Sequence, residues 1–198
     1  MPRAKQRTPE LRDQVLAAAL RVLAADGVAA LTARRVAGEA HTSTPAVYEF
    51  FKDKGGLIRA VFFEGFQILG GHLERAVPAG GPEQELRATV AALRAFIAEN
   101  PVLAQVMFGR PFTAFDPGPD EAAAGAAVRE FITGRVRRCV EAGVLAGDAT
   151  DIAHVLLGLV LGLAAQESAG WLGTSLACAD RRWETGVRAL TDGLRPPR

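Results

Sequence analysis

The chain has 198 residues, of which 49% are hydrophobic, and its formal net charge is +1. This length allows one domain with a sizeable core or two small domains, and the balanced charge excludes a protein that is strongly basic or acidic throughout. The two cysteines, Cys139 and Cys178, lie far apart in the sequence, which excludes a disulfide framework and a cysteine-based metal site.

The first 27 residues predict a basic arm followed by one helix. Three basic side chains within residues 1–8 suit an arm that follows DNA phosphates or enters a minor groove, and a solubilising tail is the alternative. Thr8 is a candidate N-cap before Pro9, and Leu11–Ala25 carries apolar residues at helical spacing. Gly27 is a natural end for this helix.

Residues 31–54 predict two short helices joined by a tight turn. Thr32 and Ser43 are the N-cap candidates, because a hydroxyl oxygen can accept from a free backbone N–H of the first turn. His41 separates the helices, since His adopts the left-handed conformation that ends a helix more readily than most residues other than Gly. The residues that the second helix and its turn leave outside are small and mostly carry hydroxyls: Thr42, Ser43, Thr44, Ala46 and Tyr48.

Short outward side chains allow a helix to approach base pairs in the major groove, where Ser and Thr bond phosphates or base edges. The pattern therefore favours a helix-turn-helix, and the alternative is two ordinary surface helices joined by a polar turn. Residues 1–60 carry 10 Lys or Arg against 6 Asp or Glu, so the basic part of the chain coincides with this stretch. The residues expected at the DNA interface are Thr32, Arg34, Arg35, Thr42, Ser43, Thr44, Pro45, Ala46, Tyr48, Lys52 and Lys54.

This stretch resembles the DNA-binding signature of the TetR (tetracycline-repressor-like) family. The resemblance covers roughly residues 8–64 and rests on the pattern Val36-Ala37-x-x-Ala40-x-x-Ser43-x-x-x-Val47-Tyr48-x-x-Phe51-x-x-Lys54-x-x-Leu57. The chain departs from the family pattern by His41 at the usual turn Gly, Thr42 at an apolar position, Pro45 at a small one and Gly55 at the usual Glu. The resemblance implies a helical DNA-binding domain followed by a helical domain that holds an effector pocket.

The remaining residues predict further helices and no strand. A long helix over residues 57–76 ends before the break at 78–82, and the apolar spacing then predicts helices over 83–100, 102–108, 120–141 and 148–170 and a last helix capped by Thr174 or Ser175. The predicted fold is all-α with about nine helices, divided into a DNA-binding domain over 1–54 and an effector-binding and dimerisation domain over 55–198.

The last two helices predict a dimer interface. Residues 148–170 are apolar nearly all round, so this helix must be covered on all sides, and Gly158 and Gly162 permit close approach of another helix. The last helix carries an apolar seam of Leu176, Trp183, Val187, Leu190 and Leu194. Two helices from each of two chains would form a four-helix interface, and the alternative is that they complete one monomer's core.

The pocket implied by the resemblance would be lined by aromatic and soft residues: Phe62, Phe66, Phe96, Met107, Phe108, Phe112, Phe115, Leu156 and Trp171. For each of these residues, a place in the core is the alternative. Gln166, Glu167 and His154 are the polar anchor candidates on the apolar helix, and such a pocket suits a small, largely apolar effector. No metal-ligand spacing, nucleophile motif or phosphate loop is evident, so we expect no cofactor, no metal and no enzymatic activity.

The polar N-terminus shows no signal peptide, and the most apolar stretch, residues 155–165, is shorter than the ~20 residues that span a bilayer. We therefore expect a cytoplasmic homodimer that binds palindromic operator DNA. The expected function is sequence-specific transcriptional regulation by a repressor that a small-molecule effector releases from its operator. The alternative is an all-α small-molecule-binding protein or a helical-bundle enzyme without DNA binding.

Overall fold

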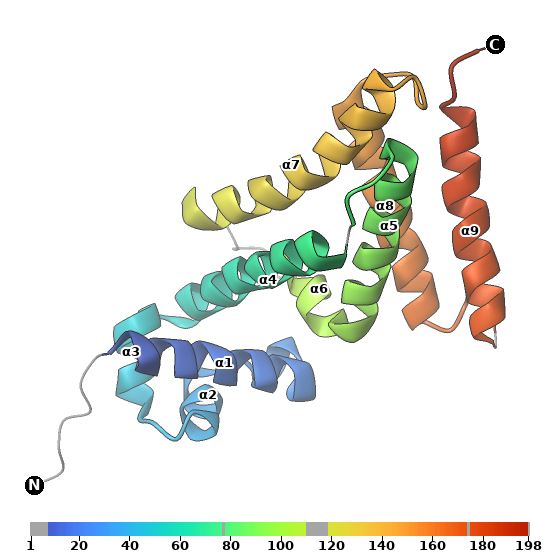
Figure 1. Ribbon diagram of the computed structural model, residues 1–198. Helices are drawn as coiled ribbons and strands as arrows, with labels where there is room; N and C mark the ends of the chain where they lie inside the picture. Colours follow the sequence, from blue (N-terminus) through green and yellow to red (C-terminus); the bar gives the residue numbers. More distant parts are fainter. Residues whose placement is uncertain (1–7, 77, 110–118, 174, 198) are drawn as a thin grey trace, which may run out of the picture. The chain divides into compact units, whose positions relative to one another are not determined.

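The computed structural model describes residues 8–76, 78–109, 119–173 and 175–197, and over these residues the chain is helical without strands (Figure 1). The α-helices are α1 (Pro9–Asp26), α2 (Ala33–Glu39), α3 (Thr44–Phe51), α4 (Lys54–Ala76), α5 (Pro82–Glu99), α6 (Pro101–Gly109), α7 (Pro119–Glu141), α8 (Ala149–Ser168) and α9 (Leu176–Gly193). A short 3₁₀ turn, Val28–Ala30, lies between α1 and α2. The all-α prediction is confirmed for the described residues. The basic arm and the predicted pocket residues Phe112 and Phe115 lie outside them.

The chain forms two compact units. Unit 1 comprises Met1–Gln67 and Asn100–Gly125, and unit 2 comprises Ile68–Glu99 and Ala126–Arg198. Helices α4 and α7 therefore each contribute residues to both units. The boundary expected between a DNA-binding domain and an effector domain, at residues 54 and 55, concerns function and stays a prediction. The boundary between the compact units lies within α4, between residues 67 and 68.

Unit 1 is built around α1, which packs against α2 and α6. The hydroxyl oxygen of Thr8 accepts from the backbone N–H of Leu11 at 3.3 Å, and Pro9 opens the helix, as predicted. Gly27 ends α1 with a φ of 78°. Glycine adopts this positive φ with little strain because it has no Cβ. The side-chain amide of Gln14 donates to the carbonyl oxygen of Ala40 at 3.1 Å, which ties α1 to the end of α2.

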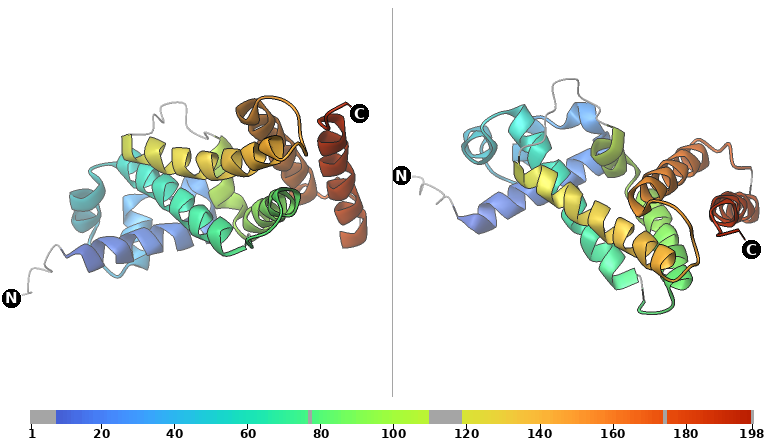
Figure 2. Two further views of the ribbon diagram at one scale, coloured as in Figure 1. Left: turned by 45° about the horizontal axis from the view of Figure 1, so that its top comes forward. Right: turned by 90° about the horizontal axis from the view of Figure 1, so that it is seen from above.

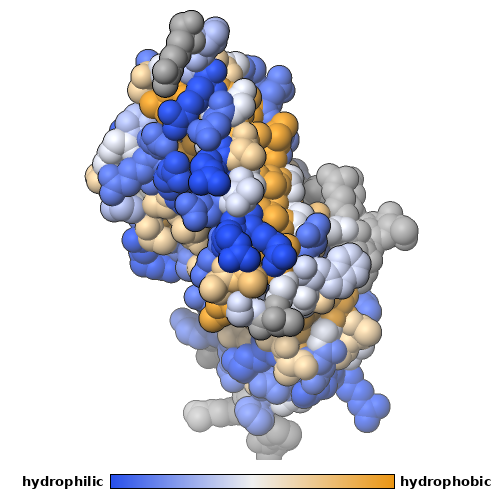
Figure 3. All heavy atoms as spheres, turned by 90° about the vertical axis from the view of Figure 1, so that its right-hand side faces the viewer, coloured by the Kyte–Doolittle hydropathy of each residue, from blue (hydrophilic) through white to orange (hydrophobic). Residues whose placement is uncertain are grey.

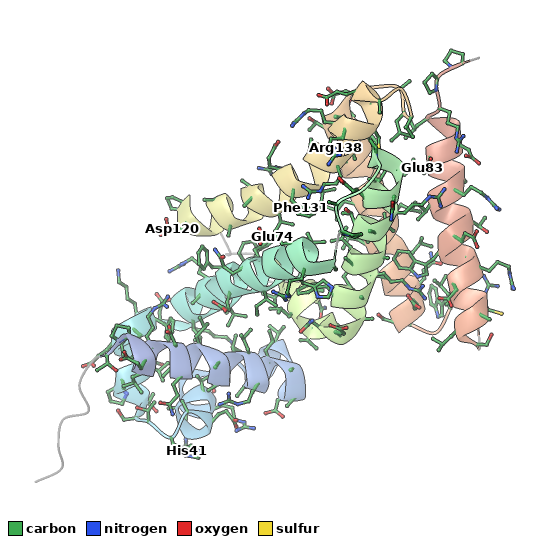
Figure 4. All side chains as sticks on the ribbon, viewed as in Figure 1. His41, Glu74, Glu83, Asp120, Phe131 and Arg138 are labelled. Carbon is green, nitrogen blue, oxygen red and sulfur yellow. The ribbon has the colours of Figure 1, made fainter. Side chains whose placement is uncertain are left out.

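Unit 2 packs α5 against α8, and α8 against α9, so that α8 lies between the other two (Figure 2). Phe96 and Leu93 of α5 and Leu156 of α8 are fully buried in its core. The carboxylate of Glu85 is also buried, and it accepts from Arg138 at 2.7 Å and from the backbone N–H of Gly80 at 3.1 Å. Figure 4 shows Arg138 on α7 beside α5. This buried carboxylate is therefore satisfied, and it fastens the segment before α5 to α7.

Helix α8 is long and apolar enough to cross a membrane by length and composition alone. The expectation that the apolar stretch is too short to span a bilayer considered residues 155–165 only. It does not hold for the whole of α8. The core helix of a soluble protein has the same composition, and α8 does bury one side in unit 2. Its buried residues are Ile152, Ala153, Leu156, Val160 and Ala164.

Candidate nucleic-acid interface

Helices α2 and α3 form the pair that the sequence predicts, and both predicted caps are in place. The hydroxyl oxygen of Thr32 accepts from the N–H of Arg35, and that of Ser43 accepts from the N–H of Ala46, each at 3.3 Å. Val47 and Phe51 turn inward and are buried, whereas Phe50 is only half-buried. The inner face of α3 thus holds it on unit 1 and leaves its other face to solvent.

The turn between the two helices is a Schellman motif with His41 at its left-handed position. The N–H of Thr42 bonds the carbonyl oxygen of Ala37 at 2.9 Å, and the N–H of His41 bonds that of Gly38 at 3.2 Å. His41 has a φ of 50°, which confirms the left-handed conformation expected for it. His41 is exposed and lies on the turn between α2 and α3 (Figure 4).

None of the eleven residues expected at the DNA interface is buried. Thr32, Arg34, Arg35, Ser43, Pro45, Tyr48, Lys52 and Lys54 are exposed, and Thr42, Thr44 and Ala46 are partly exposed. Tyr48 is 49% exposed, so a large aromatic side chain lies at the surface of α3. Unit 1 therefore presents one face of small hydroxyl side chains and one tyrosine along α3.

The two arginines of α2 differ in what holds them. Arg35 donates to Asp26 at 3.0 Å and lies 3.6 Å from Glu39, while Arg21 of α1 donates to the same Glu39 at 2.9 Å. The bond from Arg21 holds the pKa of the Glu39 carboxyl below its ordinary value. Arg34 makes no ion pair with any residue in the described part of unit 1. Arg34 is thus the arginine whose charge is available to a partner.

The passage from α3 to α4 is a very tight turn. The N–H of Asp53 bonds the carbonyl oxygen of Phe51 at 2.7 Å, and Lys52 between them has a φ of 64° and a ψ of −55°. The carboxylate of Asp53 accepts from the N–H of Gly56 at 2.7 Å, so Asp53 caps the start of α4. A Cβ on Gly56 would lie 1.9 Å from the carbonyl oxygen of Phe51, so only glycine fits there. This turn fixes the exposed Lys52 and Lys54 at the end of α3.

The residues expected to line an effector pocket separate into three groups. In unit 1, Phe66 lies 4.8 Å from Phe62 and 5.7 Å from Phe108 between ring centroids, and Met107 packs against Gly65 nearby. In unit 2, Phe96 and Leu156 are fully buried. Gln166 and Trp171 are exposed on unit 2, and Trp171 is 79% exposed, so neither joins a buried cluster in the described structure.

The polar anchors expected on α8 have other roles in the fold. Glu167 accepts from Arg94 and from the indole N–H of Trp183, so its carboxylate is occupied. The Nδ1 atom of the exposed His154 lies 2.8 Å from the carbonyl oxygen of Thr150 in the preceding turn. Because these partners lie far apart in the sequence, periodicity alone contained no signal for the Glu167 contacts.

One face of α8 has no cover within the described chain. Val155 is 56% exposed, and a Cβ on Gly158 or Gly162 would meet no atom within 4 Å. Ala165 and Ala169 continue this face at spacings of three and four residues, and apolar side chains form a band next to α9 in Figure 3. On α9, Trp183 and Val187 are buried, whereas Leu176 is 79% exposed.

Two family profiles match the chain. A profile of bacterial regulatory proteins of the tetR family matches residues 15–61, and a profile of tetracyclin repressor-like C-terminal domains matches residues 86–190. The first match contains α2, α3 and the turns on either side of α3, and the second contains α8 and most of α9. No curated protein matches the sequence.

Several solved structures share the fold. A protein of unknown function from Rhodococcus sp. RHA1 is 27% identical with a TM-score of 0.83, covering 98% of this chain and 100% of that chain. A bacterial regulatory protein in the tetR family from Rhodococcus RHA1 is 23% identical with a TM-score of 0.67, covering 92% and 98%. A TetR family transcription regulator from Marinobacter aquaeolei VT8 is 16% identical with a TM-score of 0.73, covering 94% and 96%.

Proposed function

The chain belongs to the tetR family of bacterial regulatory proteins and is a DNA-binding transcriptional regulator, and we propose that it is a homodimeric repressor that an effector releases from a palindromic operator. The main support for the position of the DNA-binding site is the exposed face of α3. Its small hydroxyl side chains and Tyr48 are accessible, while Val47 and Phe51 anchor the opposite face. A helix of this kind fits a major groove.

We propose a division of labour among the exposed residues of this face. Thr42, Thr44 and Ala46 meet base edges, because short side chains allow the backbone of α3 to approach the bases. Tyr48, Lys52, Lys54 and Arg34 bond phosphates, and Thr32, Ser43 and Pro45 hold the starts of the two helices at the DNA. Arg35 has a smaller part, since it is held by Asp26 and Glu39.

The second copy of the chain would be held by α8 and α9. The uncovered face of α8 is apolar and includes two glycines with open space above them, so another helix can pack closely there. A symmetric partner would cover this face with the same face of its own α8. Two recognition helices are then available for two half-sites about 34–36 Å apart, and operator palindromy follows from the two-fold symmetry.

The effector is proposed to be a small, largely apolar molecule. The support is the aromatic group of Phe62, Phe66 and Phe108 with Met107, which offers rings and a polarisable sulfur. Release requires that the effector bind the DNA-free form more tightly than the DNA-bound form. We place the protein in the cytoplasm, where its operator is, and assign it no catalytic step and no cofactor.

Selection of duplex DNA from a random-sequence pool tests the DNA-binding proposal directly. The wild-type protein should enrich a palindromic sequence and bind it with an affinity that falls steeply as salt rises. The Tyr48→Ala and Lys54→Ala variants should bind that sequence more weakly while they retain the helical circular-dichroism spectrum and the dimer. Failure to enrich any sequence, together with turnover of a small molecule, would favour the enzyme alternative instead.

A further inference from the structure

Two side-chain polar atoms in the described chain are buried without a hydrogen-bond partner, and both belong to unit 2. They are the Nε atom of Arg135 on α7 and the Nε2 atom of His72 on α4. Buried polar groups in folded proteins are nearly always bonded, so each orphaned atom calls for an explanation. The Arg135 guanidinium is the costlier of the two to leave unbonded, because it is always charged.

Arg135 lies on the inward face of α7. It comes three residues after Ile132 and four before Cys139, both of which are buried, and residues at these spacings share one face of a helix. The side chain of Arg135 is itself half-buried. A charged residue at such a position costs free energy unless an opposite charge lies beside it.

No carboxylate of the described chain pairs with Arg135, although Arg137 on the same helix donates to Glu130 at 3.0 Å. The ring of Phe131, one turn before Arg135 on α7 (Figure 4), lies beneath the guanidinium, with 3.6 Å between the guanidinium carbon and the ring centroid. This cation–π contact offsets part of the cost of burial, but it uses the face of the guanidinium and leaves the N–H donors at its edge unbonded. Water can accept from one of these N–H groups, whereas only an anion also neutralises the charge.

We infer that the effector carries a carboxylate and that Arg135 binds it. A guanidinium presents Nε–H and one Nη–H side by side, at a spacing that matches the two oxygens of a carboxylate. Stacking on Phe131 restricts the guanidinium, so less side-chain freedom is lost when the anion binds. This inference rests on the proposed function, and it gives the largely apolar effector one acidic group.

Benzoate and octanoate are suitable probes, because each joins a carboxylate to an apolar body, and benzyl alcohol and octanol are their uncharged counterparts. The dissociation constants are measured by titration calorimetry and the thermal midpoints at constant ionic strength, with the carboxylate replacing chloride. The carboxylates should raise the thermal midpoint of the wild type, since a ligand that binds only the folded chain stabilises it. The alcohols should raise it less at the same concentration.

Arg135→Met removes the charge and keeps a long side chain that can pack on Phe131. This variant should bind the carboxylates about tenfold more weakly or worse, the size of one hydrogen bond to a charged group. Its ligand-free thermal midpoint should be unchanged or higher, because a half-buried unpaired charge is removed. Arg137→Met is the matched control, since Arg137 is exposed and paired with Glu130, and it should bind the carboxylates as the wild type does.

Equal carboxylate affinity in the wild type and Arg135→Met, or no carboxylate binding by the wild type, would overturn the inference. A loss of alcohol binding and of stability in Arg135→Met, parallel to the loss of carboxylate binding, would show a purely structural role and would overturn it as well.

The duplex that the wild type selects from a random-sequence pool separates this inference from the proposed function. At constant ionic strength, octanoate should weaken the binding of the wild type to that duplex and leave the binding of Arg135→Met unchanged. A wild type that binds carboxylates through Arg135 but selects no DNA would overturn the proposed function and leave the carboxylate site standing. A wild type that selects DNA but does not bind the carboxylates would overturn this inference alone.

Discussion

The indole Nε1 of Trp183 donates to a carboxylate oxygen of Glu167 at 2.7 Å, so that α9 is bonded to α8 through a partly buried pair. Arg94 of α5 donates to the same carboxylate at 3.0 Å and to Asp180 of α9 at 2.7 Å. The Arg94 guanidinium also lies 5.1 Å from the ring centroid of Trp183, within range of a cation–π contact. Three helices of unit 2 therefore share one group of bonded side chains.

This group predicts a pH-dependent contribution to stability. Hydrogen bonds from Arg94 hold the pKa of Glu167 below its ordinary value of 4.5, against the opposing effect of burial. Because the folded pKa is the lower one, the contribution is complete above pH 4.5 and is lost as the pH falls through the folded pKa. Glu167→Gln should lower the free energy of unfolding by about 1–2 kcal/mol at pH 7, a range that allows for the partial exposure of the pair. The difference in unfolding free energy between the variant and the wild type should become smaller in acid.

Denaturant unfolding at pH 7 and at pH 3.5 would measure this difference. The Glu99→Gln variant is a suitable control, because Glu99 is exposed at the end of α5 and forms no ion pair with a described residue. A Glu167→Gln deficit of the same size at both pH values would mean that the carboxylate charge does not stabilise unit 2.

Substitution of the two arginines of α2 should have different effects on the salt dependence of DNA binding. Arg34→Ala should lower the slope of log affinity against log salt by about one and leave the thermal midpoint unchanged, because Arg34 has no ion-pair partner in the described chain. Arg35→Ala should instead lower the unfolding free energy by about 0.5 kcal/mol, as is usual for exposed ion pairs, with the smaller effect on the slope. Equal slopes for the two variants would contradict this division.

Gly56 and Gly55 provide a matched pair at the start of α4. Gly56→Ala should lower the unfolding free energy by about 1–3 kcal/mol, because its Cβ would lie 1.9 Å from the backbone oxygen of Phe51. Gly55→Ala should have little effect, since its Cβ would meet the side chain of Asp53 at 3.1 Å and alanine favours the helix. Thermal unfolding of both variants decides the comparison, and similar midpoints would count against so tight a turn.

The proposed dimer can be tested with a glycine that faces open space. Gly158→Arg adds a long charged side chain where no atom lies within 4 Å, so the protomer should fold normally while dimerisation weakens at least tenfold. Operator binding should weaken in parallel. Gly134→Arg is the control, because Gly134 on α7 also meets no atom within 4 Å but lies off the α8 face.

Sedimentation equilibrium of the wild type, Gly158→Arg and Gly134→Arg would give the three association constants. A wild-type monomer, or a Gly158→Arg dimer as tight as the wild type, would rule out α8 as the interface.

Local features of this fold could be read from the sequence because they depend on neighbouring residues. The hydroxyls of Thr32 and Ser43 cap α2 and α3 as predicted, since a cap needs only the residues of the next turn. The short 3₁₀ turn at Val28–Ala30 was missed because three residues carry no periodicity. Apolar spacing likewise predicted most helices to within two residues of their ends.

Long-range contacts were the part that the sequence could not supply. Arg94 and Glu167 lie 73 positions apart, so nothing in the local pattern pairs them. Trp171 was expected in a pocket on its residue type alone, and it is instead 79% exposed between α8 and α9. Its neighbours include Gly170 and Gly173 with positive φ values, which turn the chain there, and composition could not specify the direction.

The tight turn before α4 also bears on the construction of hybrid regulators. A hybrid that exchanged recognition helices by joining two chains between residues 54 and 55 would take Phe51 and Gly56 from different parents. The carbonyl oxygen of Phe51 lies so close to Gly56 that no Cβ fits between them. A parent with any residue larger than glycine at position 56 would clash with the carbonyl oxygen of Phe51 and distort the turn. A chimaera should therefore carry Phe51 through Gln67 from a single parent, and its seam belongs where the compact units themselves divide.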